Sequence, residues 1–484
     1  MPAALSPSEK ALLPLIEQWI NQHRPQFIAD LAGWIAHASI SRADLTRPGA
    51  PFGPACAAML QDVLAQAQTA GFRTENHQGY AGTVVYGQQQ YEIGLIAHLD
   101  VVPAGDNWTF PPFQLTQHGD FLTGRGVGDN KGPALMNLYL LRLLRDLNVP
   151  LHHNLRLIYG VAEETTMADL IWYQQHAAIP EYSLVTDGFF PVNHAQKGQL
   201  TFTLRLENAG ELAAMRAGNA SNSIPANAEL IVDEKRIKQL ADQQKNRHHN
   251  VTLSHSIMRA QGSGGHAAWP EGSTNAALRL LSAPLLLDYL PVREQQLAHQ
   301  LVSLFASPYG AGFNLSLEDE ASGKLTLNAG LWQSDGQGTL RITCDIRYPV
   351  TCRGEEIIAR IQAQIAGSEL TLEDQWEDSA PFYLPATHPV ISLLQESWNA
   401  LSGRDEPSYA MGGLTYSKVF PRAITFGPGY QPTAENTPDF LPPGHGFPHG
   451  ADETLHLPSL LQALPHYVIA LIRLDAWLHH HRQK

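Results

Sequence analysis

Three short apolar segments of this 484-residue chain each end in acidic or histidine residues, and this pattern restricts the folds open to it. IGLIAHLD ends at His98 and Asp100, LIYGVAEE ends at Glu163 and Glu164, and SLVTD ends at Asp187. Continuous apolar runs of this kind are typical of strands that are covered on both faces. In open α/β sheets, ligands bind at the carboxyl ends of the strands. We therefore predict an α/β domain whose mixed, mostly parallel sheet gathers these side chains at one edge.

The order of helical and extended segments supports a domain of this class. Apolar periodicity predicts helices over 7–40, 53–70, 131–146 and 165–178, and strands over 82–87, 91–100, 154–164 and 182–187. The same alternation returns near the C-terminus, where it predicts helices over 388–403 and 457–478 and a strand over 422–428. Alternating helices and strands indicate an α/β architecture.

The middle of the chain has a different pattern. From about residue 199, strands that alternate apolar and polar residues are expected over 199–208, 324–333 and 339–349, with helices over 274–290 and 355–365. Alternation of this kind is typical of a sheet with one face exposed. We therefore predict that residues 1–198 and 377–484 form one discontinuous α/β domain, into which residues 199–376 are inserted as an α+β domain.

Composition excludes several classes of partner. Lys and Arg number 32 against 46 Asp and Glu, so the formal net charge of −14 disfavours nucleic acid and anionic membrane surfaces. The N-terminal segment lacks the basic region of a signal peptide, and no uninterrupted apolar run reaches the roughly 18 residues of a membrane span. We expect a cytoplasmic protein. The three cysteines lie outside any C-x-x-C motif, so a metal site would have to use histidine and carboxylate ligands.

Two further features favour a metal site at the predicted sheet edge. Asp129 lies in the loop GRGVGDNKGP (124–133), whose glycines allow the backbone to approach a crowded centre. The alternative, a nucleotide-binding loop, is disfavoured because Lys131 is not followed by Ser or Thr and Asp129 would repel phosphate. His98 and Asp100 are two residues apart, so both side chains face one side of a strand end, and Asp100 can orient the imidazole.

With these residues in place, the chain resembles the M20 metallopeptidases, and within them the large bacterial dipeptidase branch of PepV-type and carnosinase-like enzymes. The motifs that carry the resemblance are HLD (98–100), GRGVGDNKGP (124–133), AEE (162–164), TDGFFP (186–191), GSGGHAAWPEGSTNA (262–276) and HGADE (449–453). They follow one another in the family's order, and Asp129 comes 31 residues after His98, as in that branch.

The resemblance implies two divalent metal ions, with zinc expected and manganese or cobalt as alternatives. One ion would be held by His98, Asp129 and Asp187, and the other by Asp129, Glu164 and His449, with the Asp129 carboxylate shared. His445 is a second histidine of the same segment, but the H-x-A-x-E pattern favours His449 as the ligand.

The resemblance implies that residues 1–198 and 377–484 are the catalytic domain and residues 199–376 a lid domain. It also assigns the catalytic and substrate-binding residues. Asp100 would orient His98, and Glu163 would be the general base. His266 of the inserted domain would stabilise the reacting oxyanion. Asn222, Arg347, Gly412 and Gly413 would bind substrate.

The expected activity is hydrolysis of dipeptides or very short peptides. A related N-acyl amino acid amidohydrolase or deacetylase would use the same metals and the same base, and a catalytically silent binding protein is a third possibility that Glu163 argues against. Because an inserted domain of this length can replace a partner subunit, we expect a monomer.

Overall fold

The computed structural model describes residues 4–243 and 251–482, and the chain divides into two compact units. Unit 1 comprises residues 1–194, 384–409 and 415–484, and unit 2 comprises residues 195–383 and 410–414. Each unit has a sheet and a core of its own. Residues 410–414, which the sequence prediction placed with the catalytic domain, pack with unit 2.

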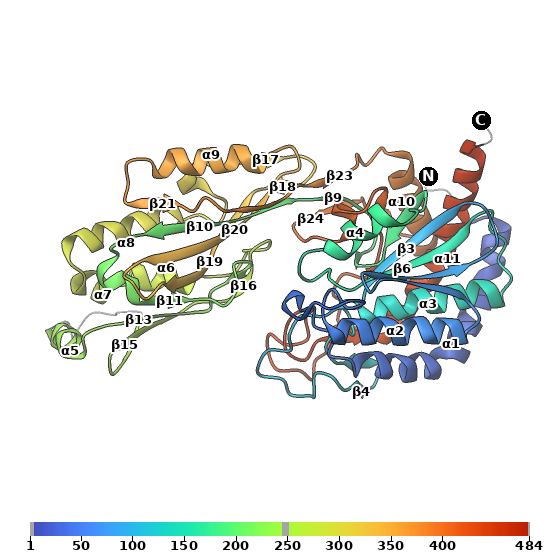
Figure 1. Cartoon of the computed structure of the whole chain (residues 1–484), viewed down its shortest axis with the longest axis horizontal. Helices are drawn as coiled ribbons and strands as arrows, with labels where there is room; N and C mark the ends of the chain where they lie inside the picture. Colours follow the sequence, from blue (N-terminus) through green and yellow to red (C-terminus); the bar gives the residue numbers. More distant parts are fainter. Residues whose placement is uncertain (1–3, 244–250, 483–484) are drawn as a thin grey trace. The chain divides into compact units, whose positions relative to one another are not determined.

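Unit 1 is built on a six-stranded mixed sheet (Figure 1). Its strands, in spatial order, are β1 (Arg73–His77), β2 (Ala81–Tyr86), β6 (Asn154–Gly160), β3 (Glu92–His98), β7 (Tyr182–Val185) and β25 (Ala423–Thr425). The last four strands run parallel to one another, whereas β1 and β2 pair in antiparallel fashion. The predicted α/β class with a mixed, mostly parallel sheet is confirmed.

The central position of β3 explains its composition. It pairs with β6 on one side and β7 on the other, and its residues from Ile93 to His98 are all buried. Glycine at position 94 is required by close packing, because a Cβ there would lie 2.2 Å from the Ser183 hydroxyl of β7. Since β3, β6 and β7 are parallel, the segments that follow them emerge at the same edge of the sheet.

Helices of unit 1 cover this sheet and one another. They are α1 (Pro7–Ile35), α2 (Pro54–Thr69), α3 (Lys131–Asp146), α4 (Ala168–His176), α10 (Pro389–Ser402) and α11 (Leu457–Arg482). Helix α3 packs on β3 and β6, and both α1 and α11 pack against α3. Helix α1 begins with a capping box in which Ser6 and Glu9 each accept the other's backbone N–H. Thirteen of the sixteen residues of α3 are buried, as expected for a helix with neighbours on several sides.

Unit 1 also contains short strands near the carboxyl edge of the sheet and beside it. They are β4 (Thr116–His118), β5 (Phe121–Thr123), β27 (Thr454–His456), β8 (Gly188–Phe189) and β26 (Pro428–Gly429). β27 pairs with β5, so a C-terminal segment is fixed next to the segment that precedes the Asp129 loop. The chain passes between the units within or beside the strands β9 (Asn193–Gln196), β23 (Phe382–Tyr383) and β24 (Tyr409–Met411).

Unit 2 contains a large antiparallel sheet. Its strands, in spatial order, are β14 (Thr252–Ser254), β15 (Ile257–Gln261), β13 (Asn227–Ile231), β11 (Met215–Ala217), β19 (Thr326–Ser334), β20 (Leu340–Tyr348), β10 (Gly198–Leu206) and β21 (Leu370–Leu372), with β22 (Glu377–Ser379) also paired to β10. Two short antiparallel pairs accompany it, namely β12 (Ser223–Ile224) with β16 (Gly265–His266) and β17 (Glu318–Asp319) with β18 (Gly323–Lys324).

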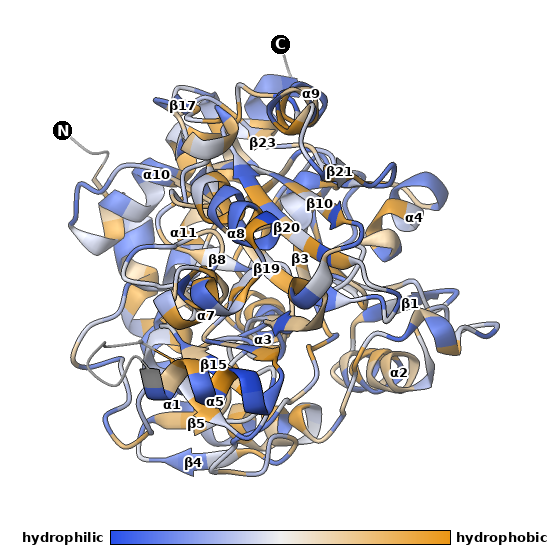
Figure 2. Ribbon diagram, turned by 90° about the vertical axis from the view of Figure 1, so that its left-hand side faces the viewer, coloured by the Kyte–Doolittle hydropathy of each residue, from blue (hydrophilic) through white to orange (hydrophobic). Residues whose placement is uncertain are grey.

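The helices of unit 2 are α5 (Glu234–Gln243), α6 (Ala276–Leu281), α7 (Pro284–Tyr289), α8 (Val292–Leu304) and α9 (Gly354–Ile365). Helix α6 packs on β13 and β15, and α9 packs on β10 and β21. Figure 2 shows hydrophilic and hydrophobic residues alternating along α8 and α9, as expected for helices with one buried face. The predicted α+β class of this region is confirmed.

Two helix predictions were wrong in extent. The segment 274–290 forms two helices instead of one, because Pro284 has no N–H to continue α6 and begins α7 instead. Helix α1 ends at Ile35, five residues before the predicted end at 40. Helix α8 was not predicted at all, although its buried residues Leu297, Leu301 and Leu304 follow helical spacing.

One helix of the described chain, α11, is long and apolar enough to cross a membrane by length and composition alone. However, 67% of its most apolar window is buried inside the structure, which is typical of a core helix in a globular protein. Its buried residues include Leu464, Val468 and Leu471.

The core of unit 1 contains a histidine on α11 that is 8% exposed, His466. Its ring packs against those of Trp398 and Phe190, with centroids 4.4 and 5.1 Å away. Burial lowers the pKa of His466 to about 3, because the charged imidazole would lose its hydration. Below about pH 6.5 the unfolded chain therefore binds a proton that the folded chain excludes, and the free energy of unfolding falls as the pH drops.

We expect the His466→Phe variant to lose less stability on acidification than the parent protein. Between pH 7 and 5 the histidine should account for about 2 kcal/mol of the parent's loss, measured by chemical denaturation at each pH. His480→Phe, at an exposed position of the same helix, is the control and should follow the parent curve. Parallel curves for the parent and His466→Phe would show that His466 is not buried in its neutral form.

Candidate metal centre

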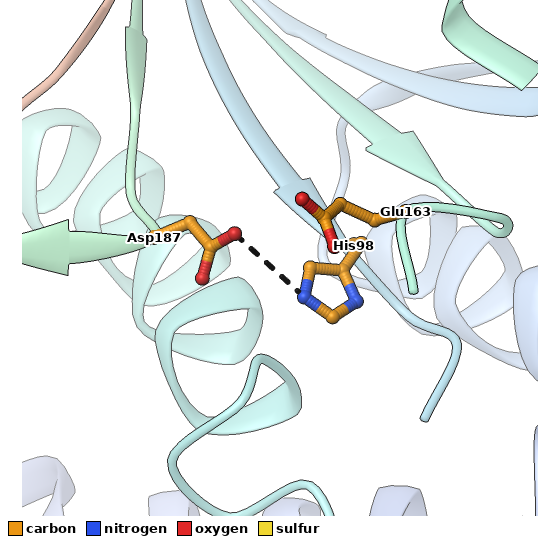
Figure 3. Close-up of side chains that lie close together, drawn as sticks. All are labelled: His98, Glu163 and Asp187. Carbon is orange, nitrogen blue, oxygen red and sulfur yellow. Dashed lines mark ion pairs between the residues drawn. The ribbon is translucent and has the colours of Figure 1, made fainter. Parts of the chain in front are cut away.

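The acidic and histidine residues that end the parallel strands of unit 1 meet in one cluster. His98 ends β3, Glu163 and Glu164 follow β6, and Asp187 follows β7. The loops that carry Asp129 and His449 bring two more side chains to the same place. Figure 3 shows His98, Glu163 and Asp187 converging from three segments of the chain.

Asp129 lies between the two histidines. Nε2 of His98 is 2.9 Å from Oδ1 of Asp129, and Nε2 of His449 is 3.1 Å from Oδ2 of the same carboxylate. Each imidazole has a further acidic neighbour, since Nε2 of His98 lies 3.8 Å from Asp187 Oδ2 and Nε2 of His449 lies 2.9 Å from Glu164 Oε2. Each oxygen of Asp129 thus faces one histidine, and each histidine has one further carboxylate beside it.

Several imidazole and carboxylate atoms of the cluster lie close enough together to hold divalent cations. One donor atom from each of His98, Glu163 and Asp187 lies within 4.8 Å of the others, and the same holds for His98, Asp129 and Glu164. Two ligands bound tetrahedrally at 2.0–2.2 Å from zinc are about 3.3–3.6 Å apart. The Nε2–oxygen separations of 2.9–3.8 Å bracket this spacing. Imidazole and carboxylate ligands suit zinc, manganese and cobalt.

Buried acidic groups without a compensating cation raise one another's pKa. Burial, followed by repulsion from neighbouring carboxylates, raises the pKa of Glu164 and that of Asp187 each to about 7. Burial likewise raises the pKa of Glu163 well above its usual range. One oxygen of Glu163 and one of Glu164 are buried without a hydrogen-bond partner. Such atoms are costly unless a cation or proton satisfies them, so the cluster fits divalent metal ions.

The two histidines and Asp129 face unlike charges, which raise the pKa values of the histidines and lower that of Asp129. Burial lowers the pKa of His449, but its hydrogen bonds with Asp129 and Glu164 outweigh this effect and raise it to about 11. Burial raises the pKa of Asp129, but hydrogen bonds from His449 and His98 leave it well below its usual range. Asp129 is therefore suited to remain ionised, as a shared metal ligand would be.

Asp100 connects His98 with the turn that carries Glu163 and Glu164. Its carboxylate lies 3.3 Å from Nδ1 of His98, whose ring nitrogen also lies 3.0 Å from the Asp100 carbonyl. The same carboxylate accepts the backbone N–H groups of Glu163 and Glu164 at 3.1 and 3.0 Å. The sequence predicted only its contact with His98. Its second role, as an anchor for the Glu163–Glu164 turn, is visible only in the folded chain.

Asn130 is a further positioning residue that the sequence analysis did not identify. Its side-chain N–H group donates to Oδ1 of Asp187 at 2.8 Å and to the Thr186 carbonyl at 3.0 Å. Its side-chain oxygen accepts the backbone N–H of His98 at 3.3 Å. Its position next to Asp129 in the loop was the sequence signal that could have indicated this role. A single amide therefore fixes His98 relative to Asp187.

The turn that carries Glu163 rests on a second buried carboxylate. Asp169 accepts the backbone N–H groups of Val161 and Ala162 at 2.6 and 2.8 Å, and it also accepts the hydroxyl of Tyr416. Tyr416 lies within GGLTYSK (412–418), the segment whose glycines Gly412 and Gly413 are expected to bind substrate. Part of this segment thus supports the acidic turn.

His445, the alternative ligand, lies outside the cluster. Its Nδ1 is 2.7 Å from Oδ2 of Asp452, and the other oxygen of Asp452 accepts the backbone N–H groups of Thr109 and Phe110 at 2.8 and 3.0 Å. The described contacts of His445 therefore hold Asp452, which in turn holds the backbone of residues 109–110.

The remaining predicted residues lie together in unit 2. The backbone N–H of Ala267 donates to the Asn222 carbonyl at 2.9 Å, and β12 pairs with β16, so Asn222 and His266 are neighbours. Gly412 packs so tightly against Ala268 that a Cβ would lie 2.7 Å from its methyl group. A Cβ at Gly413 would lie 3.9 Å from Trp269.

Arg347 joins this group through Gly412. Its Nη1 donates to the Gly412 carbonyl at 2.9 Å, and the rest of its guanidinium binds both oxygens of Asp345 at 2.7 and 3.1 Å. The side chain is buried. Arg347 thus holds the glycine turn at 412–413 with its charge balanced by Asp345.

Comparison with known proteins agrees with this geometry. Residues 94–468 match the family described as Peptidase family M20/M25/M40. The chain belongs to this family.

Relatives and solved structures cover most of the chain. The protein named "Putative dipeptidase YtjP" of Bacillus subtilis (strain 168) is 28% identical over 477 residues, which is 94% of this chain and 98% of the relative. The "Beta-Ala-Xaa dipeptidase" of Lactobacillus delbrueckii subsp. lactis is 26% identical over 442 residues, which is 88% of this chain and 90% of the relative. The crystal structure of human carnosine dipeptidase 1 shares the fold, with a TM-score of 0.57, 14% identity and coverage of 96% and 99% of the two chains. This M20 chain is a peptidase hydrolase.

We expect the Asp100→Asn variant to bind metal about 10- to 100-fold more weakly than the parent. The amide has one acceptor oxygen and cannot accept from both backbone N–H groups of the Glu163–Glu164 turn while facing Nδ1 of His98. Competition between the metal-free protein and a chromogenic chelator for zinc measures the change.

Asp106→Asn provides the matched control for this variant, because Asp106 is an exposed residue of the same segment. It should leave zinc affinity as in the parent. Equal affinity in the parent and Asp100→Asn would mean that Asp100 does not position the ligands.

Proposed function

We propose that the protein is a dinuclear metal-dependent dipeptidase that hydrolyses the peptide bond of dipeptides or very short peptides. The observation that carries the proposal is the position of Asp129, whose two oxygens lie 2.9 and 3.1 Å from the Nε2 atoms of two different histidines. We propose His98, Asp129 and Asp187 as ligands of one ion and Asp129, Glu164 and His449 as ligands of the other. Zinc is the expected metal, with manganese or cobalt as alternatives.

Two divalent ions held in this way would lower the pKa of a water molecule and polarise the substrate carbonyl. Glu163 is suited to the role of general base. It is adjacent in sequence to a proposed ligand, one of its oxygens is buried without a partner, and burial raises its pKa toward the range in which a carboxylate accepts protons readily. We propose that Glu163 takes the proton of the attacking water and returns it to the leaving amine.

Asp100 and Asn130 would hold these groups in fixed positions during the reaction. Asp100 holds the backbone of Glu163, and Asn130 holds the side chain of Asp187. Neither residue needs to contact the substrate for this role. Their contribution is to fix the donor atoms before substrate binds, so that little reorganisation is needed in the transition state.

We propose that unit 2 is the lid domain and that it supplies the substrate-binding groups. His266 would stabilise the oxyanion, while Asn222, Gly412 and Gly413 would bind the substrate backbone and its carboxylate end. Arg347 would act largely by holding Gly412, because its guanidinium is already paired with Asp345. A lid of this kind limits substrates to short peptides and excludes water from the reaction.

The proposal is tested by assaying the purified protein, loaded with zinc, manganese or cobalt, against alanyl-alanine, β-alanyl-histidine and N-acetyl amino acids. The Lactobacillus relative, named as a β-Ala-Xaa dipeptidase, supports the inclusion of a β-alanyl substrate. We expect turnover of the dipeptides and two equivalents of metal by elemental analysis. Turnover of the acetylated compounds alone would instead establish an amidohydrolase.

The Glu163→Gln and Glu164→Gln variants separate the two adjacent acids. Glu163→Gln should retain two equivalents of metal while kcat falls about 10²- to 10⁴-fold, since the base is lost and the ligands remain. Glu164→Gln should lose metal as well as activity. If Glu163→Gln kept its rate, Glu163 would not be the base.

A further inference from the structure

A buried ion pair lies between the loops that carry Asp129 and His449. Arg125 and Glu453 are 0% and 1% exposed, and Nη1 of the arginine lies 2.7 Å from Oε2 of the glutamate. The two residues are 328 positions apart in the chain. A buried ion pair contributes little net stability compared with well-packed apolar residues, so stability alone does not explain this one.

Glu453 holds the loop that carries Asp129. Its Oε1 accepts the backbone N–H groups of Gly128 and Asp129 at 2.9 and 3.0 Å, and its Oε2 accepts that of Gly126 at 3.1 Å. The peptide plane before Asp129 is therefore fixed by one carboxylate, which is also bound to Arg125.

Arg125 holds the loop that carries His449. Its Nη2 donates to the carbonyls of His449 and Gly450, at 3.3 and 3.1 Å, and also lies 3.2 Å from the Ala104 carbonyl. The guanidinium is covered by the ring of Trp108, 5.1 Å from its centroid. The side chain of His449 itself is 47% exposed, so lateral packing restrains it only in part. Its backbone contact with Arg125 is consequently an important restraint on its position.

The other proposed metal position is held by different residues. His98 is fixed by Asp100 and Asn130, and Asp187 is fixed by Asn130. None of these contacts involves Arg125 or Glu453. The ion pair therefore acts on the Asp129–His449 side of the cluster, and it reaches the His98 side only through the shared Asp129.

We propose that Arg125 and Glu453 are a positioning pair that sets the spacing between Asp129 and His449 and thereby controls the affinity of the metal position that uses His449. The inference rests on the proposed two-metal site and adds to it two residues that have no contact of their own with the metal. It predicts unequal effects on the two ions, whereas a general loss of stability would weaken both.

The test uses the metal-free full-length chain titrated with zinc in competition with a chromogenic chelator, which yields two dissociation constants. In Arg125→Lys the positive charge remains, but a single ammonium cannot reach Glu453 and the 449–450 carbonyls as the planar guanidinium does. In Glu453→Gln the amide N–H group would face the donors of Arg125 and Gly126. Each variant should raise the dissociation constant of the zinc ion at the His449 position about 10- to 100-fold. The dissociation constant of the ion at the His98 position should change little.

Arg156→Lys is the control, because Arg156 forms an ion pair with Glu92 in the same unit without touching either ligand loop. It should leave both constants unchanged even if thermal stability falls. If Glu453→Gln does not fold, Arg125→Lys decides the question alone. Unchanged constants, or equal weakening of both, in Arg125→Lys would overturn the positioning role. Binding of fewer than two zinc ions by the parent protein would instead overturn the proposed two-metal site.

Discussion

The crowding of acidic groups at the carboxyl edge of the unit 1 sheet is the constraint on which the rest of the site depends. Parallel strands bring Glu163, Glu164 and Asp187 to one edge, and the loop after β5 adds Asp129. Their burial raises the pKa of three of the four, because the charges have lost water and face one another. In the proposed site, divalent cations would resolve this conflict, and the two imidazoles would supply neutral donors to complete their coordination.

A site of this kind needs rigid support, because an unsupported cluster of like charges would move apart. The support comes from buried polar groups that bind backbone atoms. Asp100 holds the Glu163–Glu164 turn, Asn130 connects His98 to Asp187, and Glu453 fixes the peptide of Asp129. Each of these contacts joins residues of unit 1.

Much of this arrangement was predictable from sequence because it depends on local patterns. The apolar runs before His98, Glu163 and Asp187 predict buried parallel strands, and the strand ends then place these side chains at one edge of the sheet. The class of each unit follows from the same periodicities. The contacts of Arg125 with the 449–450 carbonyls were not predictable, since no local pattern relates residues that lie more than 300 positions apart. The break at Pro284 could have been predicted, because the proline lies within the apolar run.

The central claim is that two divalent cations share the carboxylate of Asp129. Anomalous diffraction from crystals of the zinc-loaded protein, measured on both sides of the zinc edge, tests it most directly. Two zinc peaks are expected about 3.5–4 Å apart, one beside His98 and one beside His449, with Asp129 between them. A single peak, or two peaks that do not share Asp129, would contradict it.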